Sequence, residues 1–320
     1  MGSTPMGHRP NRHRRRLTHN QNTAKAFSLE PTHKPKNVSE TLKNTNRGKE
    51  KKSELLKGGE APLSGNTRDS KLVKIDVLNQ TAIITLNKPP VNALYIDLFN
   101  EITKALDVLE KDDQIRVVII TGGDRIFSAG MDLKAVGEAS PEEVLNLMET
   151  GYNFFQRLEK YPKPTIAAVK GHALGGGLGL AIACDFRIAG ENAVFGLPES
   201  KIGFPLLWGV TNLYLRTVSR GPALDLLLTG RNITAQEALR INLVKTVVPD
   251  ERVMEEALKL ADQIISNIPP FAARAIKTVL YEAYRETSPR KVFDIENRNA
   301  YEILTQIDLK SWLREYLSKE

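Results

Sequence analysis

Cysteine is almost absent from this sequence, and Cys184 is its single thiol. An intramolecular disulfide is therefore impossible, and a metal site built from several cysteines is excluded as well. Histidine is scarce beyond residue 70, where His172 stands alone. One histidine and one cysteine cannot form a zinc site of the usual kind, and no G-x-S-x-G segment is present to supply a nucleophilic serine. These absences disfavour metal and covalent-serine chemistry, and we expect His172 to be structural.

Long apolar runs are also missing, since none reaches the ~18 residues that a membrane span requires. Charge is unevenly distributed around the net value of +7. Residues 1–70 contain 15 Lys and Arg against 6 Asp and Glu, which gives +9, whereas residues 71–320 contain 30 against 32, which gives −2. The basic character therefore belongs to the N-terminal segment.

The composition of residues 1–70 predicts a disordered basic extension, because it is polar and poor in β-branched and aromatic residues. A basic cluster spans Arg12 to Arg16, and no acidic residue precedes Glu30. We expect a cytoplasmic protein, or one of an organelle matrix if this segment includes a transit peptide. A solvated tail is the favoured interpretation. The alternative is a non-enzymatic protein whose basic arm binds nucleic acid.

From residue 71 onward the spacing of apolar residues predicts strands and helices. Strands are expected over 72–78, 81–86, 117–121 and 244–248, and helices over 96–109, 141–160, 251–266, 271–286 and 290–305. The sequence Ser-Pro-Glu-Glu from Ser140 predicts a capping box, as does Thr-Ala-Gln-Glu from Thr234. Asp308 is the expected N-cap of a last helix that ends near Leu317.

The most informative stretch runs from Thr165 to Ala189. It predicts a buried strand over 165–169, a glycine turn over 175–177, an apolar helix over 178–184 and a strand over 186–189. Three glycines let backbone N–H groups approach a ligand closely, and the unpaired amides at a helix start favour an anion. The spacing does not match a dinucleotide fingerprint, because the sixth position falls on Leu180. Taken alone, a simple tight turn is an equally good interpretation.

Five segments in this order resemble the crotonase superfamily of enoyl-CoA hydratases and isomerases: NKPPVNAL from Asn87, FSAGMDL from Phe127, GHALGGG from Gly171, ACD from Ala183 and FGLPE from Phe195. The resemblance covers about residues 71–320. It implies an α/β fold, with a spiral of ββα units over 71–255 and a C-terminal helical region over 256–320. It also implies a homotrimer or a dimer of trimers, in which the C-terminal helices complete acyl pockets.

The resemblance further implies enolate chemistry on a thioester. Removing a proton next to a carbonyl puts negative charge on its oxygen, which two backbone N–H donors can stabilise. The implied donors are the amides of Met131 and Gly176, and the implied proton-transfer group is Glu199. We expect burial among Phe195, Leu197 and Phe204 to raise the pKa of Glu199.

One position departs from the hydratase pattern. Hydratases of this superfamily carry a second glutamate where this chain has Gly179. A single carboxylate suffices to move a proton between C2 and C4, so the sequence favours a Δ3,Δ2-enoyl-CoA isomerase. Hydration, decarboxylation and thioester hydrolysis remain alternatives on the same fold. We expect Asp132 and Asp185 to have structural or capping roles.

The implied substrate is an acyl-CoA thioester, and coenzyme A would enter as part of it, with no permanently bound cofactor. The positions expected to bind the coenzyme A portion are Ala93, Arg125, Ala129, Asp132, Leu133, Lys134, Gly175 and Pro198. Leu207 and Trp208 replace a glycine-rich stretch that many hydratases carry after the catalytic glutamate. We expect these two side chains to narrow or reshape the acyl pocket.

Overall fold

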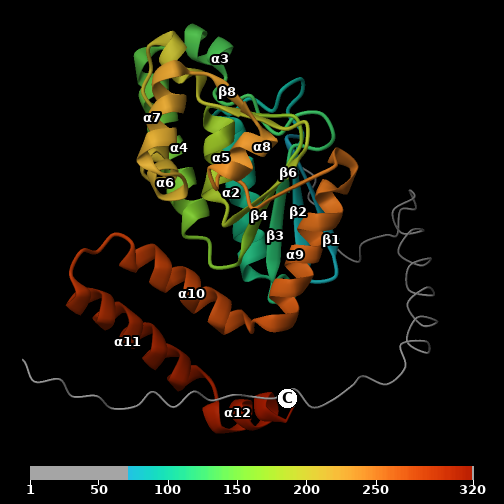
Figure 1. Ribbon diagram of the computed structural model, residues 1–320, viewed down its shortest axis with the longest axis vertical. Coiled ribbons are helices and arrows are strands. Elements are labelled where there is room, and N and C mark those ends of the chain that lie inside the picture. The colour runs from blue at the N-terminus through green and yellow to red at the C-terminus, as the bar shows by residue number, and fades with distance from the viewer. Residues whose placement is uncertain (1–70, 319–320) are drawn as a thin grey trace, which may run out of the picture. The chain divides into compact units, whose positions relative to one another are not determined.

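The computed structural model describes residues 71–318. The extension predicted over residues 1–70, with its proposed nucleic-acid and transit-peptide roles, lies outside the described residues. A six-stranded sheet forms the centre of the described part (Figure 1). In spatial order its strands are β1 (Val73–Leu78), β2 (Thr81–Leu86), β3 (Val117–Thr121), β4 (Thr165–Val169), β6 (Phe186–Gly190) and β9 (Thr246–Val248). The first two strands are antiparallel, and every later pair is parallel.

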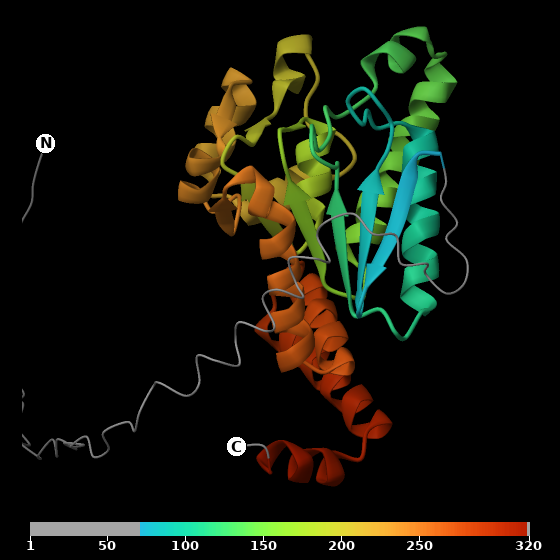
Figure 2. The ribbon, with the colours of Figure 1, turned by 90° about the vertical axis from the view of Figure 1, so that its right-hand side faces the viewer.

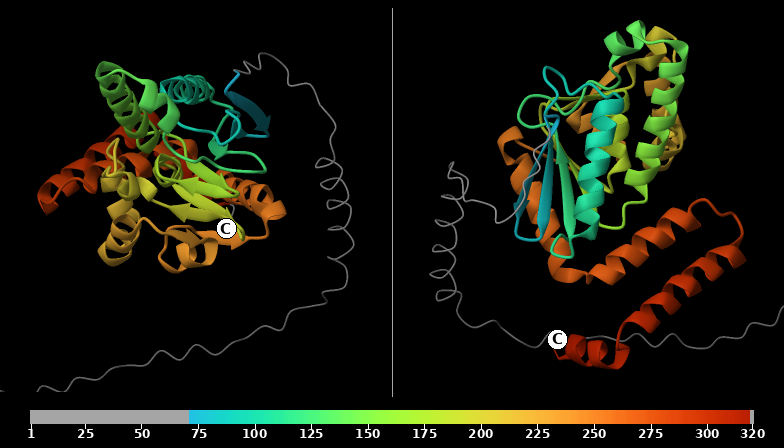
Figure 3. Two further views of the ribbon diagram at one scale, coloured as in Figure 1. Left: turned by 90° about the horizontal axis from the view of Figure 1, so that it is seen from above. Right: turned by 180° about the vertical axis from the view of Figure 1, so that it is seen from behind.

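Helices cover both faces of this sheet. On β3, Val117 and Ile119 pack with α9 (Val253–Asn267), whereas Val118 and Ile120 belong to the larger core on the other face. That larger core includes the apolar sides of α2 (Ile96–Lys111) and α4 (Pro141–Glu159), which run side by side (Figure 3). A strand buried on both faces is expected to be a continuous apolar run, as the sequence of β3 is.

A second, smaller sheet has the order β5-β7-β8. Its strands are β5 (His172–Leu174), β7 (Val194–Gly196) and β8 (Asn232–Thr234), and α5 (Gly176–Ala183) follows β5 directly. Strand–strand–helix units thus recur along the chain, which confirms the predicted α/β crotonase-like fold. The sequence did not predict these three-residue strands, because they are too short to show a period.

The remaining elements surround the two sheets. They are α3 (Leu133–Glu138), η1 (Pro198–Ile202), α6 (Val210–Thr217), α7 (Arg220–Thr229), α8 (Ala235–Arg240), η2 (Asp250–Arg252), α10 (Pro270–Ala283), α11 (Pro289–Gln306) and α12 (Leu309–Leu317). Helices α10 and α11 form a hairpin (Figure 1), and they extend beyond one end of the large sheet (Figure 2). Within residues 71–318, no helix is both long and apolar enough to cross a membrane.

Helix caps agree with the sequence at two of three places. Ser140 and Glu143 form both hydrogen bonds of a capping box, and the Asp308 carboxylate accepts from the Ser311 amide. The box predicted at Thr234 is only half formed. Its hydroxyl accepts from the Glu237 amide, but the Glu237 carboxylate pairs with Arg231 instead of returning to the cap. The nearby guanidinium competes successfully for that carboxylate because both partners are charged.

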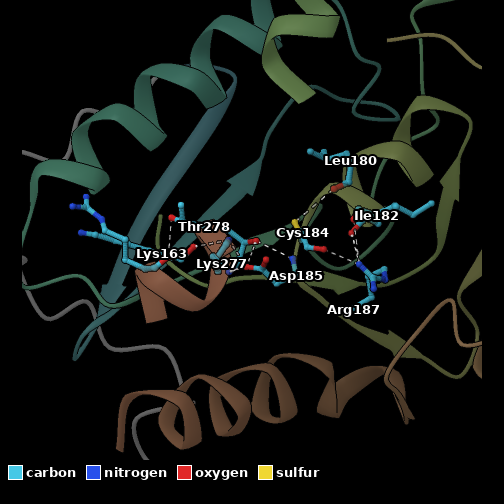
Figure 4. Close-up of polar contacts among 11 residues, drawn as sticks. Lys163, Leu180, Ile182, Cys184, Asp185, Arg187, Lys277 and Thr278 are labelled. Carbon is cyan, nitrogen blue, oxygen red and sulfur yellow. Dashed lines mark hydrogen bonds and ion pairs between the residues drawn. The ribbon is translucent and has the colours of Figure 1, made fainter. Parts of the chain in front are cut away.

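The corner between α5 and β6 is fixed by charged groups (Figure 4). The Asp185 carboxylate accepts from the amide and hydroxyl of Thr165 at 2.7 and 2.9 Å and pairs with Lys277 at 2.5 Å. Arg187 donates to the carbonyl of Cys184 at 2.7 Å and to carbonyls at the end of α5. These contacts satisfy the last carbonyls of α5 and connect this corner to β4 and α10. Asp185 therefore has the structural role that the sequence predicted.

Candidate active site

A small pocket lies where the glycine turn, the segment after β3 and η1 meet. Its lining consists of Met131, Gly175, Gly176, Glu199, Leu206, Leu207, Trp208 and Val210. The structure thus brings together all three predicted catalytic positions, the predicted contact Gly175 and both residues expected to reshape the pocket. Glu199 is the one titratable side chain in this lining.

The backbone around Met131 is held by an extended neighbour. The Leu94 amide donates to the carbonyl of Gly130 at 2.8 Å, and the Asp132 amide donates to the carbonyl of Leu94 at 3.0 Å. These two hydrogen bonds use the carbonyl of Gly130 and the amide of Asp132. The Met131 N–H between them has no acceptor among the described backbone groups. Met131 itself lines the pocket.

Gly176 provides a second free donor. It is the first residue of α5, so no preceding helical carbonyl can accept its N–H. A Cβ placed on Gly130 would lie 2.9 Å from the Gly176 nitrogen, which shows how closely the two turns approach. Helix α5 therefore begins two residues before the predicted start at Leu178, and this earlier start brings Gly176 into its first turn. Two unpaired amides, with the positive end of a helix dipole behind one of them, can stabilise an oxyanion.

Glu199 lies beside these donors, on the first turn of η1. Its side chain packs on Gly175, where a Cβ would come within 2.6 Å of the Glu199 Oε1 atom. The Oε2 atom is buried and finds no hydrogen-bond partner within the described residues. Burial raises the pKa of Glu199 above its usual range, because removing a carboxylate from water disfavours its charged form.

The surroundings of Glu199 differ in one respect from expectation. Phe195 and Leu197 are fully buried as predicted, but Phe204 is 45% exposed. The Phe204 amide instead donates to the carbonyl of Glu199 at 3.0 Å. Phe204 therefore helps to form the turn after Glu199, and its side chain does not line the pocket.

The position of the missing second glutamate is filled by apolar groups. A Cβ on Gly179 would lie 3.0 and 3.1 Å from the two Cγ atoms of Val210 and 3.5 Å from Phe155. A carboxylate there would have to displace Val210 and would sit in an apolar environment, where its charge is costly. Glu199 is thus the one carboxylate in the pocket lining.

Asn92, which was not among the residues predicted from the sequence, organises the loop before Met131. The buried Asn92 side chain donates to the carbonyls of Gly122, Ile126 and Phe127 at 3.1–3.3 Å, and its Oδ1 atom accepts from the Lys88 amide at 2.9 Å. Asn92 itself has a φ of +49°, a conformation that asparagine tolerates better than most residues. The signal was available in the segment PVNAL, where an Asn follows a Pro-rich turn.

Other predicted contacts of the coenzyme A portion lie outside the pocket lining. Ala93 and Ala129 are half-buried on adjoining segments, and Pro198 begins η1. Arg125, Leu133 and Lys134 are exposed.

Asp132 caps α3 by accepting from the Ala135 amide at 3.1 Å, and it lies 3.8 Å from Lys88. Its capping role agrees with expectation. His172 is exposed, and its backbone carbonyl accepts from the Ser128 amide. Within residues 71–318, no group of three or more His, Cys, Asp or Glu side chains is placed to hold a metal ion.

Fold and pocket together define a class, the crotonase superfamily, and comparisons with known proteins specify the family within it. Residues 77–320 match the family described as enoyl-CoA hydratase/isomerase. This chain belongs to the enoyl-CoA hydratase/isomerase family and is an enzyme of that family. The family's members act on coenzyme A thioesters.

Relatives named as hydratases are prominent among the matches. The probable mitochondrial enoyl-CoA hydratase of Dictyostelium discoideum is 36% identical over 243 residues, which cover 75% of this chain and 86% of that protein. The short-chain-enoyl-CoA hydratase of Clostridium acetobutylicum is 41% identical over 192 residues, 59% of this chain and 74% of that protein. The crystal structure of an enoyl-CoA hydratase from Bacillus anthracis aligns with a TM-score of 0.73 at 32% identity, covering 78% of this chain and 97% of that one.

Proposed function

We propose that this enzyme is a Δ3,Δ2-enoyl-CoA isomerase that uses Glu199 as its single proton carrier. The observation that carries this proposal is the pocket itself, which contains one carboxylate, while Val210 and Phe155 occupy the space beside Gly179. Hydration needs one group to activate water and another to handle the proton at C2. Isomerisation needs only one group that removes and returns a proton.

The proposed reaction needs only Glu199 and the two backbone amides of the pocket. The Glu199 carboxylate removes a proton from C2 of a 3-enoyl thioester, and the electron pair of the broken C–H bond shifts toward the carbonyl oxygen to give a dienolate. The amides of Met131 and Gly176 donate to that oxygen. Glu199 then returns the proton to C4, so that the C3–C4 double bond is lost, a C2–C3 double bond forms and the carbonyl double bond is restored. Each such donor is worth ~100–1,000-fold in rate.

The raised pKa of Glu199 suits this task. A group that must both take and give a proton works best when its pKa is near the working pH. The unpartnered Oε2 atom remains available for the substrate. Gly175 allows the carboxylate to approach the glycine turn closely.

Binding of the coenzyme A portion is proposed to involve exposed cations and small residues outside the pocket. Arg125 and Lys134 would contact the phosphates, and Ala93 and Ala129 would lie along the pantetheine. The coenzyme would be present only as part of the substrate. We also propose assembly as a homotrimer or a dimer of trimers, and a cytoplasmic or organelle-matrix location.

Hydration of 2-enoyl-CoA esters is the second candidate function. The names of the relatives favour it, since those in Dictyostelium discoideum and Clostridium acetobutylicum are called hydratases. Gly179 and its apolar neighbours favour the isomerase over this alternative.

The proposal is tested with a 3-enoyl-CoA ester that carries deuterium at C2. We expect formation of the 2-enoyl isomer, with part of the label recovered at C4, because one buried carboxylate carries the proton between the two carbons. A complete absence of isomer would overturn the proposal.

A further inference from the structure

The indole of Trp208 is enclosed at both edges by glycines. On the pyrrole side, a Cβ on Gly151 would lie 2.4 Å from the Cδ1 and Nε1 atoms. On the benzene side, a Cβ on Gly176 would lie 2.5 Å from the Cζ3 atom. Gly151 lies within α4, where glycine is unfavourable to a helix. Here it makes room for the indole, since no larger residue fits without displacing it.

Two phenylalanine rings also pack against the indole. Phe155 stacks on it with ring centroids 5.7 Å apart and an interplanar angle of 21°, and Phe99 meets it edge-on at 5.2 Å. Only 7% of Trp208 is exposed. A side chain that packs against two glycines and two aromatic rings cannot change rotamer without moving its neighbours. Trp208 is therefore a fixed wall of the pocket.

Two other lining residues are less buried than Trp208. Leu206 and Leu207 are half-buried, and residues 201–205 before them are exposed. Trp208 is therefore more enclosed than the two leucines that precede it.

We infer that Trp208, seated on Gly151, closes the acyl pocket close to the thioester and restricts the enzyme to short-chain acyl-CoA esters. This inference rests on the proposed binding of an acyl-CoA thioester at the Met131 and Gly176 amides. Gly176 links the thioester to the indole. Its N–H would donate to the thioester oxygen, and its Cα lies against the indole of Trp208. The wall therefore stands a few carbons from the reacting end, and a longer chain would meet it.

The test measures binding of saturated esters, which need no reaction. Dissociation constants of butyryl-, hexanoyl- and decanoyl-CoA are determined by calorimetry for wild type, Trp208→Phe and Trp208→Ala. Gly221→Ala is the matched control, because nothing lies within 4 Å of a Cβ at that position. Because each buried methylene strengthens binding severalfold, we expect Trp208→Ala to bind decanoyl-CoA at least about tenfold more tightly than wild type. Trp208→Phe, which keeps the aromatic packing, should show a smaller gain.

The chain-length preference of wild type and of the two variants distinguishes the possible outcomes. Wild type that prefers the short esters, with a preference that shifts to decanoyl-CoA in both variants, supports the inference. Equal affinity of wild type for short and long esters would overturn it, and so would an unchanged preference in the folded Trp208→Phe protein. Failure of wild type to bind any of the three esters would overturn the proposed function and this inference with it.

Discussion

The Glu199 carboxylate packs directly on Gly175, so closely that a Cβ at Gly175 would lie 2.6 Å from Oε1. Gly175 also has a φ of +53°, which L-residues with a side chain adopt only at a cost. Gly175→Ala should therefore displace the base and strain the turn that presents the Gly176 amide. We expect kcat/KM to fall by at least about 100-fold, since a positioned general base contributes 10²–10⁴-fold.

Steady-state kinetics on the 3-enoyl ester measures this effect. Gly221→Ala serves as the control, because its added methyl group meets no neighbour. Activity of Gly175→Ala within a few fold of wild type would mean that Glu199 does not need its place on this glycine.

Replacing the base itself gives the second prediction. Glu199→Gln keeps the size of the side chain and removes its ability to accept a proton, so we expect kcat to fall by about 10²–10⁴-fold. Binding of a saturated acyl-CoA ester should stay within a few fold, because the amide donors are unchanged. Glu191→Gln, an exposed exchange outside the pocket, should retain full activity. Comparable turnover by both variants would contradict the assignment.

The pH dependence of activity follows from the raised pKa of Glu199. The base must be ionised to remove a proton, so kcat/KM should decline as pH falls through this raised pKa. We expect the acid limb at a pH above that of an ordinary carboxylate, and we expect it to be absent from the residual activity of Glu199→Gln. An acid limb at the usual carboxylate value would show that burial does not shift this group.

The same raised pKa predicts a pH-dependent stability. The native state holds the proton of Glu199 to a higher pH than the unfolded chain does. The resulting stabilisation is present below the unfolded-state pKa and is lost as pH rises through the native pKa. The free energy of unfolding of wild type, relative to Glu199→Gln, should therefore decrease as pH rises across that interval. Urea unfolding at a series of pH values measures this difference in unfolding free energy. A difference that does not change with pH would contradict the prediction.

Asn92 should contribute to both stability and activity. Asn92→Ala would remove the donor of three loop carbonyls and the acceptor of the Lys88 amide. Leaving buried polar groups unpaired costs about 1–3 kcal/mol each, so we expect a loss of about 2–4 kcal/mol in urea unfolding and a lower kcat. Asn100→Ala, on the exposed side of α2, is the control. Unchanged stability in Asn92→Ala would show that the loop holds its shape without this side chain.

Asp185 should affect stability alone. Asp185→Ala removes the partner of Thr165 and Lys277, and we expect a loss of about 2–3 kcal/mol. The folded variant should keep its kcat, because Asp185 does not line the pocket. Asp262→Ala, an exposed exchange on α9, controls for loss of charge. If the variant is fully folded under the assay conditions and its kcat still falls greatly, Asp185 has a role in the reaction.

Sequence patterns predicted the long elements well. The bounds of β2, β3 and β4 agree with the predicted strands, because these buried strands consist of uninterrupted apolar and β-branched residues. The small sheet was missed, since its three-residue strands depend on partners far along the chain.

The site was predicted less completely than the fold. Met131, Gly176 and Glu199 do share one pocket, but Phe204, which was expected to be buried beside Glu199, is 45% exposed. The packing of Trp208 against Gly151 could not be predicted from the sequence. The two residues are 57 positions apart, and no local pattern indicates that they are in contact.

The most direct test of the central claim is a mass-resolved product assay on purified protein, with a 3-enoyl-CoA and a 2-enoyl-CoA ester offered separately. Short-chain esters should be used, given the wall at Trp208. A pocket with Glu199 as its one carboxylate predicts that the 3-enoyl ester becomes the 2-enoyl isomer without a change in mass, and that the 2-enoyl ester gains little or no water. Rapid gain of one water by the 2-enoyl ester, with no isomerisation of the other, would contradict the account and identify a hydratase that works without a carboxylate at position 179.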